Sequence, residues 1–407
     1  MTNPESIMVE TKSGEVNTES LDLVAIHKAA EDYEWVDSNE RLAALCLEWR
    51  KQPLLGLDTE FLRTDTFYPK PGLIQVACCG QCYLLDPLKI TEFDEFIRVL
   101  TDPSVLKILH ACSEDLELFV ECFGAAPQPI FDSQVAGAFL GLGLSIGYQR
   151  LLDTLFQVEV GKEETRSDWL QRPLTDAQKL YAAIDVTYLS PIHQILSDRL
   201  RQQGKLAWVM EECQRLVDSA AQPADHGRSY LQRFKQAWKL QPKQLAVLKE
   251  LSAWREDEAR KRDMPRNFLL HNNSIMEMAI RPPGNMRALA AVEKMRGRTV
   301  STDGKQLLTL VQDALDAPLD PNLESPPRPL PSSWAKRLKP LKETIRQVAD
   351  QLELAPEMLV RRKDLEELVR SGLDGQEFAL PVELKGWREE VVGQQLLEQL
   401  QSIDKAE

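Results

Sequence analysis

Short apolar runs alternate with helically spaced ones over the first half of the chain, from about residue 33 to residue 200. The short runs predict four strands, and the first three follow one another closely enough to pair as antiparallel neighbours. The fourth is reached through a predicted helix, which is the pattern of a β-α-β crossover. We therefore expect an α/β domain with a mixed sheet flanked by helices. The predicted strands are Leu54–Phe61, Leu73–Cys79, Cys82–Leu85 and Val105–His110, and the predicted helices lie near Phe93–Leu100 and at Glu114–Phe123.

The second and third strands are joined by Cys79-Gly80-Gln81-Cys82, which predicts a tight hairpin turn. The spacing of Cys79 and Cys82 would also suit half of a zinc site, but the sequence holds no second ligand pair at matching spacing. Seven cysteines, an odd number in a chain without a secretory signal, favour reduced thiols. We expect a turn here and no zinc site.

A further helix is predicted to begin at Thr175, because a Thr at the N-cap and Gln178 three residues later can bond each other's free backbone N–H groups. Its apolar positions continue to about Leu200. Beyond about residue 235 the chain is predicted to be helical, except between Asp316 and Ser333, where six prolines exclude a helix. We therefore divide the chain into an acidic, disordered tail (1–28), the α/β domain (29–210), a first helical domain (235–316), a Pro-rich linker (317–332) and a second helical domain (333–407).

The net charge of −14 at first argues against a nucleic-acid partner, because phosphate binding depends on Lys and Arg. The distribution of the charge weakens this objection. Residues 1–40 hold ten acids and two lysines, whereas residues 254–298 hold ten basic and six acidic residues, so a basic face is expected on the first helical domain. Residues 332–407 hold 12 basic and 15 acidic residues, and we expect the second helical domain to pack against the α/β domain instead of binding nucleic acid.

The N-terminus lacks the basic start and the apolar core of a signal peptide. The longest uncharged stretch, Ser133–Gln149, has 17 residues and four glycines, which is short of the roughly 20 apolar residues of a membrane helix. We expect a soluble, cytoplasmic protein with no membrane partner, and the sequence indicates no protein partner.

Two acids stand in one of the apolar strands. Asp58 and Glu60 lie two residues apart, so both carboxylates leave the same side of the strand, roughly 7 Å apart along the chain. Such a pair is costly unless a cation neutralises it, and carboxylate oxygens suit Mg²⁺ or Mn²⁺. The alternative is that Asp58 caps the strand and Glu60 faces solvent.

Two further motifs carry acids on predicted helices. After the strand that ends at His110, the first helical turn holds Glu114 and Asp115, which taken alone are more typical of favourable charges at a helix N-terminus. Tyr181 and Asp185 lie one helical turn apart on the same face, with roughly 6 Å between their Cβ atoms. A tyrosine there could hold a water beside a metal-bound carboxylate, or it could be a core residue whose hydroxyl bonds an acid.

Taken together, Asp58-x-Glu60, His110 with Asp115, and Tyr181-x-x-x-Asp185 resemble the three exonuclease motifs of the DEDD superfamily, in the subgroup that uses Tyr. The runs Asp58-Thr59-Glu60-Phe61-x-Arg63 and Ser167–Leu174 are similar to those of the bacterial ribonuclease D family. Residues 242–315 and 335–402 resemble the paired helicase-and-RNase-D C-terminal (HRDC) domains of that family. The resemblance spans about residues 33–402 in the family's own order, and the acidic tail before residue 30 departs from it.

The resemblance implies a ribonuclease H-like α/β fold and a 3′→5′ exoribonuclease that releases nucleoside 5′-monophosphates. RNA with a free 3′ end is then the expected partner, with precursor tRNA and other small structured RNAs as substrates. Tyr181 would orient the attacking water, and two divalent ions, Mg²⁺ or Mn²⁺, would be bound by Asp58, Glu60, Asp115 and Asp185. Three further residues could shape the substrate pocket: Arg63, Gln75 and His110. Each could equally be a residue that packs or forms hydrogen bonds within the fold.

Three other functions remain open. Residues 143–147 fit the G-x-S-x-G pattern of a serine hydrolase, with Asp185 and His193 following in the right order, although a helix and not a strand is predicted before Ser145, at Gln134–Leu140. A catalytically inactive binding protein could keep the fold, although the four acids and the tyrosine are all present. The same chemistry on DNA is the nearest alternative, since the acids do not read the 2′-OH.

Overall fold

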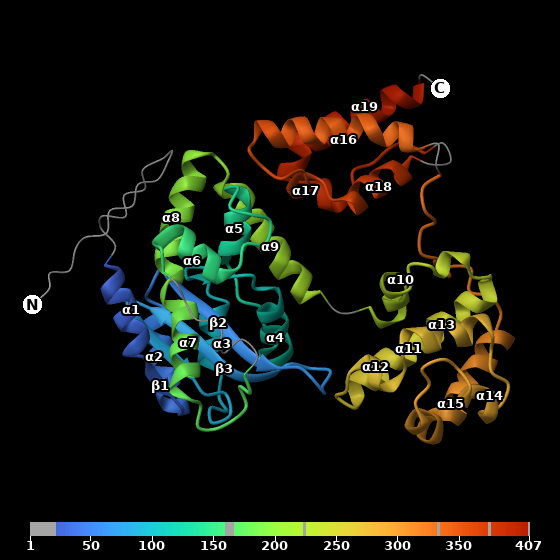
Figure 1. The fold of residues 1–407 in the computed structure, drawn as a ribbon, viewed down its shortest axis with the longest axis horizontal. Coiled ribbons are helices and arrows are strands. Elements are labelled where there is room, and N and C mark those ends of the chain that lie inside the picture. The colour runs from blue at the N-terminus through green and yellow to red at the C-terminus, as the bar shows by residue number, and fades with distance from the viewer. Residues whose placement is uncertain (1–21, 159–166, 223–224, 332–333, 373–375, 406–407) are drawn as a thin grey trace, which may run out of the picture.

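The structure, a computed structural model, describes residues 22–158, 167–222, 225–331, 334–372 and 376–405, arranged as an α/β domain followed by two helical domains (Figure 1). The α/β domain holds a six-stranded sheet in the order β1-β4-β3-β2-β5-β6. The pairs β2–β3 and β3–β4 are antiparallel, whereas β1–β4, β2–β5 and β5–β6 are parallel, so the expected mixed sheet is confirmed. The strands are β1 (Glu34–Val36), β2 (Leu54–Leu62), β3 (Lys70–Cys78), β4 (Gln81–Leu85), β5 (Leu106–Leu109) and β6 (Ile130–Asp132).

The hairpin between β3 and β4 closes at two residues with positive φ, Cys79 (54°) and Gly80 (76°). Cys78 pairs with Gln81 across the turn. Two central residues in the left-handed region make the type of turn whose twist matches that of the two strands. The predicted turn is therefore confirmed, and among the described residues no candidate metal group includes a cysteine.

Helix α7 (Asp176–Thr187) lies across β2, β3 and β4. Its start is the predicted capping box, because the Gln178 backbone N–H donates to the Thr175 hydroxyl and the Thr175 N–H donates to the Gln178 side chain. The other helices of this domain are α1 (Leu23–Glu31), α2 (Asn39–Trp49), α3 (Asp94–Leu100), α4 (Ser113–Phe123), α5 (Ser133–Phe139), α6 (Tyr148–Phe156), α8 (Leu189–Gln202) and α9 (Leu206–Ala221).

Two predictions about this domain are wrong in their bounds. The tail was expected to run to residue 28, but α1 begins at Leu23, because Asp22 caps it and its apolar side packs on the sheet domain with Ala30 buried. Residues 1–21 lie outside the described residues. The helix that starts at Thr175 ends at Thr187 and does not reach Leu200. Pro191 causes this break, since it has no N–H for the Thr187 carbonyl.

The first helical domain has its own core, which includes Phe67 from the tip of the β2–β3 hairpin, and Tyr68 packs against it. Phe67 at this tip is 3% exposed, and the guanidinium groups of Arg260 and Arg266 lie 4.6 and 4.3 Å from the centre of its ring. Asp263 accepts hydrogen bonds of 3.0 Å from the backbone N–H groups of Phe67 and Tyr68. The domain comprises α10 (Ser229–Arg233), α11 (Pro242–Lys261), α12 (Arg266–Leu269), α13 (Asn272–Ile280), α14 (Met286–Ala290) and α15 (Gly297–Asp316), with 3₁₀ turns at His226–Arg228 and Ala237–Lys239.

Replacing Asp263 by Ala is expected to loosen the hairpin tip from the first helical domain. Two backbone donors lose their acceptor, which costs about 1–3 kcal/mol where the groups stay buried. Amide hydrogen exchange at Phe67 and Tyr68 should become faster in Asp263→Ala. Asp263→Asn is the matched control, because its amide oxygen can accept the same bonds and Asn tolerates the positive φ of 45° at this position. Equal exchange in both variants would contradict the proposed role of the carboxylate.

The second helical domain packs against α9 of the α/β domain, as expected. The Trp387 ring stacks on Trp208 with 5.0 Å between centroids, and Arg388 Nη2 lies 2.9 Å from Glu212 Oε2. Lys205 Nζ also donates to the Leu352 carbonyl at 2.7 Å. Its helices are α16 (Trp334–Gln351), α17 (Pro356–Leu359), α18 (Arg362–Ser371) and α19 (Gln394–Lys405), with a 3₁₀ turn at Val382–Leu384 and a π-helical turn at Glu389–Gly393.

The Pro-rich linker between the two helical domains contains no helix or strand over its described residues, 317–331. None of the described helices combines the length and the apolar character that crossing a lipid bilayer requires.

Candidate active site

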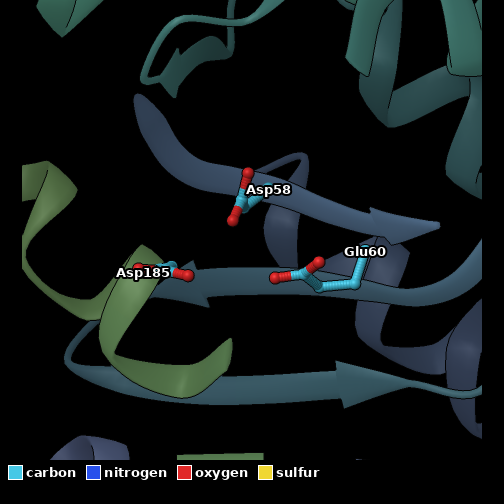
Figure 2. A group of neighbouring side chains, drawn as sticks. All are labelled: Asp58, Glu60 and Asp185. Atoms are coloured by element: carbon cyan, nitrogen blue, oxygen red, sulfur yellow. The ribbon is translucent and has the colours of Figure 1, made fainter. Parts of the chain in front are cut away.

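Three carboxylates from two elements meet above the middle of the sheet (Figure 2). Asp58 and Glu60 come from β2, where alternation turns both toward the same side, and Asp185 comes from α7, which crosses that strand. One oxygen from each lies within 4.8 Å of the other two. The predicted convergence of these three acids is therefore present in the structure.

Asp115 lies on the wall of the same pocket but outside this close trio. It stands in the first turn of α4, and its Oδ1 accepts a short hydrogen bond from the Thr59 hydroxyl. Thr59 lies between the two acids of β2, so its side chain leaves the opposite side of the strand and can reach α4. The pocket has a volume of about 230 Å³ and is lined by Leu57, Asp58, Thr59, Glu60, Phe61, His110, Ala111, Glu114, Asp115, Tyr148, Tyr181 and Asp185.

Tyr181 lines the pocket one helical turn before Asp185, and the two side chains share a hydrogen bond. The Trp169 side chain is 2% exposed, and its ring packs beside that of Tyr181, with 6.2 Å between the ring centroids. Arg172 fixes the segment that carries this tryptophan, because its guanidinium bonds both oxygens of Asp86, at 3.0 and 2.6 Å, and the Gly72 carbonyl, at 2.6 Å. The Ser167–Leu174 run thus positions the tyrosine and does not itself line the pocket.

Two aromatic side chains close the other wall. His110 Nδ1 is 2.9 Å from the Ser133 hydroxyl, whereas its Nε2 has no partner among the described residues. Burial lowers the pKa of His110, so the ring is neutral at pH 7. Tyr148 donates to the Ile184 carbonyl at 3.0 Å and was not identified from the sequence, because no motif or acid lies beside it in the chain.

The other two candidate substrate residues lie outside this pocket. Arg63 forms an ion pair with Glu117, with both N–O distances at 2.8 Å, and it faces a second cavity near the first helical domain. Gln75 stands opposite Asp58 in the sheet, is 0% exposed and has no surface with which to touch a substrate. The amide nitrogen and oxygen of Gln75 have no hydrogen-bond partner among the described residues.

The negative charges of the four acids repel one another. Burial and the negative charges of its three neighbours raise the pKa of Asp58 well above its ordinary value. Burial, followed by the charges of Asp185 and Asp115, raises the pKa of Glu60 to about 9. The pKa of Asp185 rises to about 7 through burial, with the Tyr181 hydrogen bond opposing the rise. Burial raises the pKa of Asp115 to about 6, against the lowering effect of Thr59.

This donor set fits a divalent ion. Carboxylate oxygens are hard ligands of the kind that Mg²⁺ and Mn²⁺ prefer. No Lys or Arg of the described residues lines the pocket to balance the acids, so a bound cation is the simplest source of the missing positive charge.

Without metal, the protein is expected to gain stability as the pH falls from about 9 to about 5. The folded-state pKa values of Glu60 (about 9) and Asp185 (about 7) lie above those of the unfolded chain, so the folded protein binds more protons and stability is lost as the pH rises through these values. Thermal unfolding in EDTA across this range measures the effect. Added Mg²⁺ should raise the melting temperature most at high pH. A melting temperature that changes neither with pH nor with added Mg²⁺ would contradict this electrostatic account.

The serine hydrolase alternative fails on local structure. Ser145 lies in a turn between α5 and α6 and does not follow a strand. The His193 ring packs edge-on against Phe131, 4.7 Å between centroids, and Asp185 belongs to the acid trio. The strand-serine-helix geometry that such an enzyme needs is absent from these described residues.

The basic segment 254–298 divides into two parts. Arg255 is buried, and the segment's other four basic residues in α11 and α12, with the C-cap, are held in ion pairs with acids of the same domain. The remaining basic residues of the segment are exposed and form no ion pair with a described residue: Arg281, Arg287, Lys294, Arg296 and Arg298. The expected basic face is therefore smaller than the charge count of the segment indicated.

Comparison with known families finds matches to three consecutive parts of the chain. A model described as 3′-5′ exonuclease matches residues 33–201, one described as HRDC domain matches 244–311, and one described as ribonuclease D, C-terminal HRDC domain matches 333–396.

Among curated proteins, the chain is 44% identical to ribonuclease D of Pseudomonas paraeruginosa over 92% of this chain and 99% of that protein. It is 36% identical to ribonuclease D of Escherichia coli over 91% of this chain and 99% of that protein. The crystal structure of the E. coli enzyme, described as an exoribonuclease involved in structured RNA processing, superposes with a TM-score of 0.84 at 34% identity, over 91% of this chain and 99% of that one. The catalytic core of RRP6 from Trypanosoma brucei shares the fold, with a TM-score of 0.54 at 22% identity over 76% of this chain and 84% of that one.

Proposed function

The chain belongs to the ribonuclease D family and is a 3′→5′ exoribonuclease, and from this premise we propose a two-metal mechanism at the acid pocket. Asp58, Glu60 and Asp185 would hold the ions from one side, and Asp115 would supply the fourth carboxylate from α4. The observation that carries this proposal is the approach of three half-buried carboxylates to within 4.8 Å, in a pocket to which no described residue contributes a cationic side chain.

When bound, two divalent ions would supply an acidified water and charge stabilisation for an in-line displacement at phosphorus. The protein's own groups fix the geometry. Thr59 holds Asp115 in one orientation through its hydroxyl. Burial and the neighbouring acids raise the pKa of Tyr181, so its hydroxyl stays protonated and donates to Asp185. The oxygen of that hydroxyl can then accept a hydrogen bond from the attacking water and orient it.

The products would be nucleoside 5′-monophosphates, and the substrates precursor tRNA and other small structured RNAs with a free 3′ end. The five exposed basic residues of the first helical domain, on segment 281–298, support contact with the body of such an RNA. We further propose that the catalytic unit runs from α1 through α9 (23–221), that the first helical unit runs from α10 through α15 (229–316) and begins before the expected residue 235, and that 317–332 link it to the second helical unit at 333–407.

The experiment that tests this function compares 5′-labelled and 3′-labelled RNA and DNA of one sequence, with and without Mg²⁺. We expect the 5′-labelled RNA to shorten one nucleotide at a time, while the 3′ label is released as a mononucleotide. Both reactions should require Mg²⁺, and RNA should be cleaved faster than DNA. Equal rates on DNA would favour a DNA exonuclease of the same superfamily. Binding without cleavage under all metal conditions would favour a non-catalytic RNA-binding protein.

A further inference from the structure

The tip of the β2–β3 hairpin points toward the first helical domain (Figure 1). A second cavity lies at this junction, outside the acid pocket. Its volume is about 570 Å³. Four arginines line it, Arg63 from the hairpin and Arg233, Arg255 and Arg266 from the helical domain, whereas Glu117 is its one acid among the described residues. The wall is therefore strongly positive.

Arg255 is the buried member of this group, with 1% of its surface exposed. Its Nη1 donates to the Leu270 carbonyl at 2.9 Å and to Asn272 Oδ1 at 2.7 Å. Its Nε is buried without a hydrogen-bond partner among the described residues. Burial, followed by the charges of Arg233 and Arg266, lowers the pKa of Arg255 to about 10, so it stays charged at pH 7. A buried charge without a counter-charge is unfavourable, and this guanidinium has only neutral acceptors.

The acids near the cavity do not balance its arginines. Glu117 is engaged by Arg63, and Glu256 is engaged by Arg266, with 2.6 Å between Nη2 and Oε1. Glu256 is also shared with a further arginine of α11. Arg233 forms no ion pair with a described residue, and burial and the charge of Arg266 lower its pKa. Arg233 and Arg255 thus face the cavity with no acid of the described residues within ion-pair distance, and the one carboxylate whose charge acts on both, Glu256, is already bonded by Arg266.

We propose that this cavity binds a phosphate group among Arg63, Arg233, Arg255 and Arg266. Planar guanidinium groups donate paired hydrogen bonds that match phosphate oxygens, and a tetrahedral anion can accept from several arginines at once. The hydroxyl of Thr66 and the amide of Asn272 add neutral polar groups to the wall. The phosphate could be a phosphodiester of the RNA strand or a free phosphomonoester, since both present the same oxygens.

The position of the cavity favours the RNA strand. Arg63 follows Glu60 by three residues along the extension of β2, a distance of roughly 10 Å along the strand. Glu117, the partner of Arg63, follows Asp115 by two residues on α4. A strand whose 3′ end lies at the acids can therefore place a phosphate upstream of the scissile bond in this cavity. The choice of the RNA strand as source rests on the proposed function, whereas phosphate affinity itself does not.

The test uses the full chain and compares wild type with Arg233→Gln, a substitution that breaks no ion pair. Arg98→Gln is the control, because Arg98 is an exposed arginine of α3 that does not line the cavity, and its ion pair with Glu95 lies at the surface, where such pairs contribute little to stability. In EDTA, ³¹P line widths of inorganic phosphate and of a nucleoside 5′-monophosphate report binding. With Mg²⁺, KM is measured for a short RNA that carries one uncharged methylphosphonate linkage, moved along the strand one position at a time.

We expect a neutral linkage at one internal position to raise KM about tenfold in wild type and Arg98→Gln, the effect of losing one charge-assisted contact. In Arg233→Gln the KM for the unmodified RNA should already be raised, and the neutral linkage should cause no further increase in KM. Phosphate broadening in EDTA that is lost in Arg233→Gln, together with a flat linkage scan, would assign the pocket to a free phosphomonoester. Unchanged phosphate binding and unchanged KM in Arg233→Gln would overturn the proposal. The EDTA measurement decides the phosphate site even if no cleavage is observed.

Discussion

Replacing Asp58 by Asn is expected to lower kcat by about a thousandfold or more, because it removes one of the carboxylates that would hold the ions needed for the chemical step. The change keeps the volume of the side chain, so the fold should be retained. Single-turnover cleavage of 5′-labelled RNA in saturating Mg²⁺ measures the effect without product release. Asp153→Asn, an exposed acid of α6 outside the pocket, is the matched control and should leave kcat unchanged.

The same substitution should stabilise the metal-free protein. The pKa of Asp58 is raised by burial and by the charges of Asp115, Asp185 and Glu60, so a neutral amide at this position relieves repulsion at pH 7. We expect the melting temperature of Asp58→Asn in EDTA to rise by about 2–4 °C, which corresponds to about 1 kcal/mol. A variant that lost both activity and stability would instead indicate that Asp58 is a structural residue.

Replacing Tyr181 by Phe is expected to lower kcat about a hundredfold with little change in KM. The hydroxyl donates to Asp185 and can orient the water that attacks, a contribution comparable to that of a positioned acid-base group. The phenyl ring keeps its contact with Trp169, so the wall of the pocket should survive. The split between kcat and KM, measured over a range of RNA concentrations, separates water positioning from substrate binding.

Tyr230→Phe is the control for Tyr181→Phe, because it also removes a tyrosine hydroxyl that donates a hydrogen bond, here to the Glu324 carbonyl at 2.6 Å in the first helical domain. It should leave kcat unchanged. If Tyr181→Phe kept full kcat, or altered KM alone, the assignment of this hydroxyl to the attacking water would be wrong.

Local patterns in the sequence predicted the parts of the site that lie within single elements. Alternation along β2 placed Asp58 and Glu60 on one side, and the 3.6-residue helical repeat placed Tyr181 and Asp185 on one face. The capping box at Thr175 fixed the phase of that helix. The short edge strands β1 and β6, of three residues each, were missed because alternation needs a longer run to be recognised.

Contacts between elements could not be predicted in the same way. The bond from Thr59 to Asp115 joins residues 56 positions apart, and no spacing rule connects them. The basic segment shows the same limit, since a linear count of charges does not reveal that Arg266 is already paired with Glu256. Arg63 was expected at the substrate pocket as part of the run Asp58-Thr59-Glu60-Phe61-x-Arg63, but the extension of β2 carries it to the junction with the first helical domain.

The most direct test of the two-metal account is a crystal structure of this protein with Mn²⁺, in which anomalous scattering locates the ions. We predict two anomalous peaks about 4 Å apart. Asp58, Glu60 and Asp185 should surround one of the two ions, and Asp115 should also bind the pair of ions. Both peaks should be lost in Asp58→Asn. No peak at these carboxylates at saturating Mn²⁺, in crystals of an active preparation, would contradict the account.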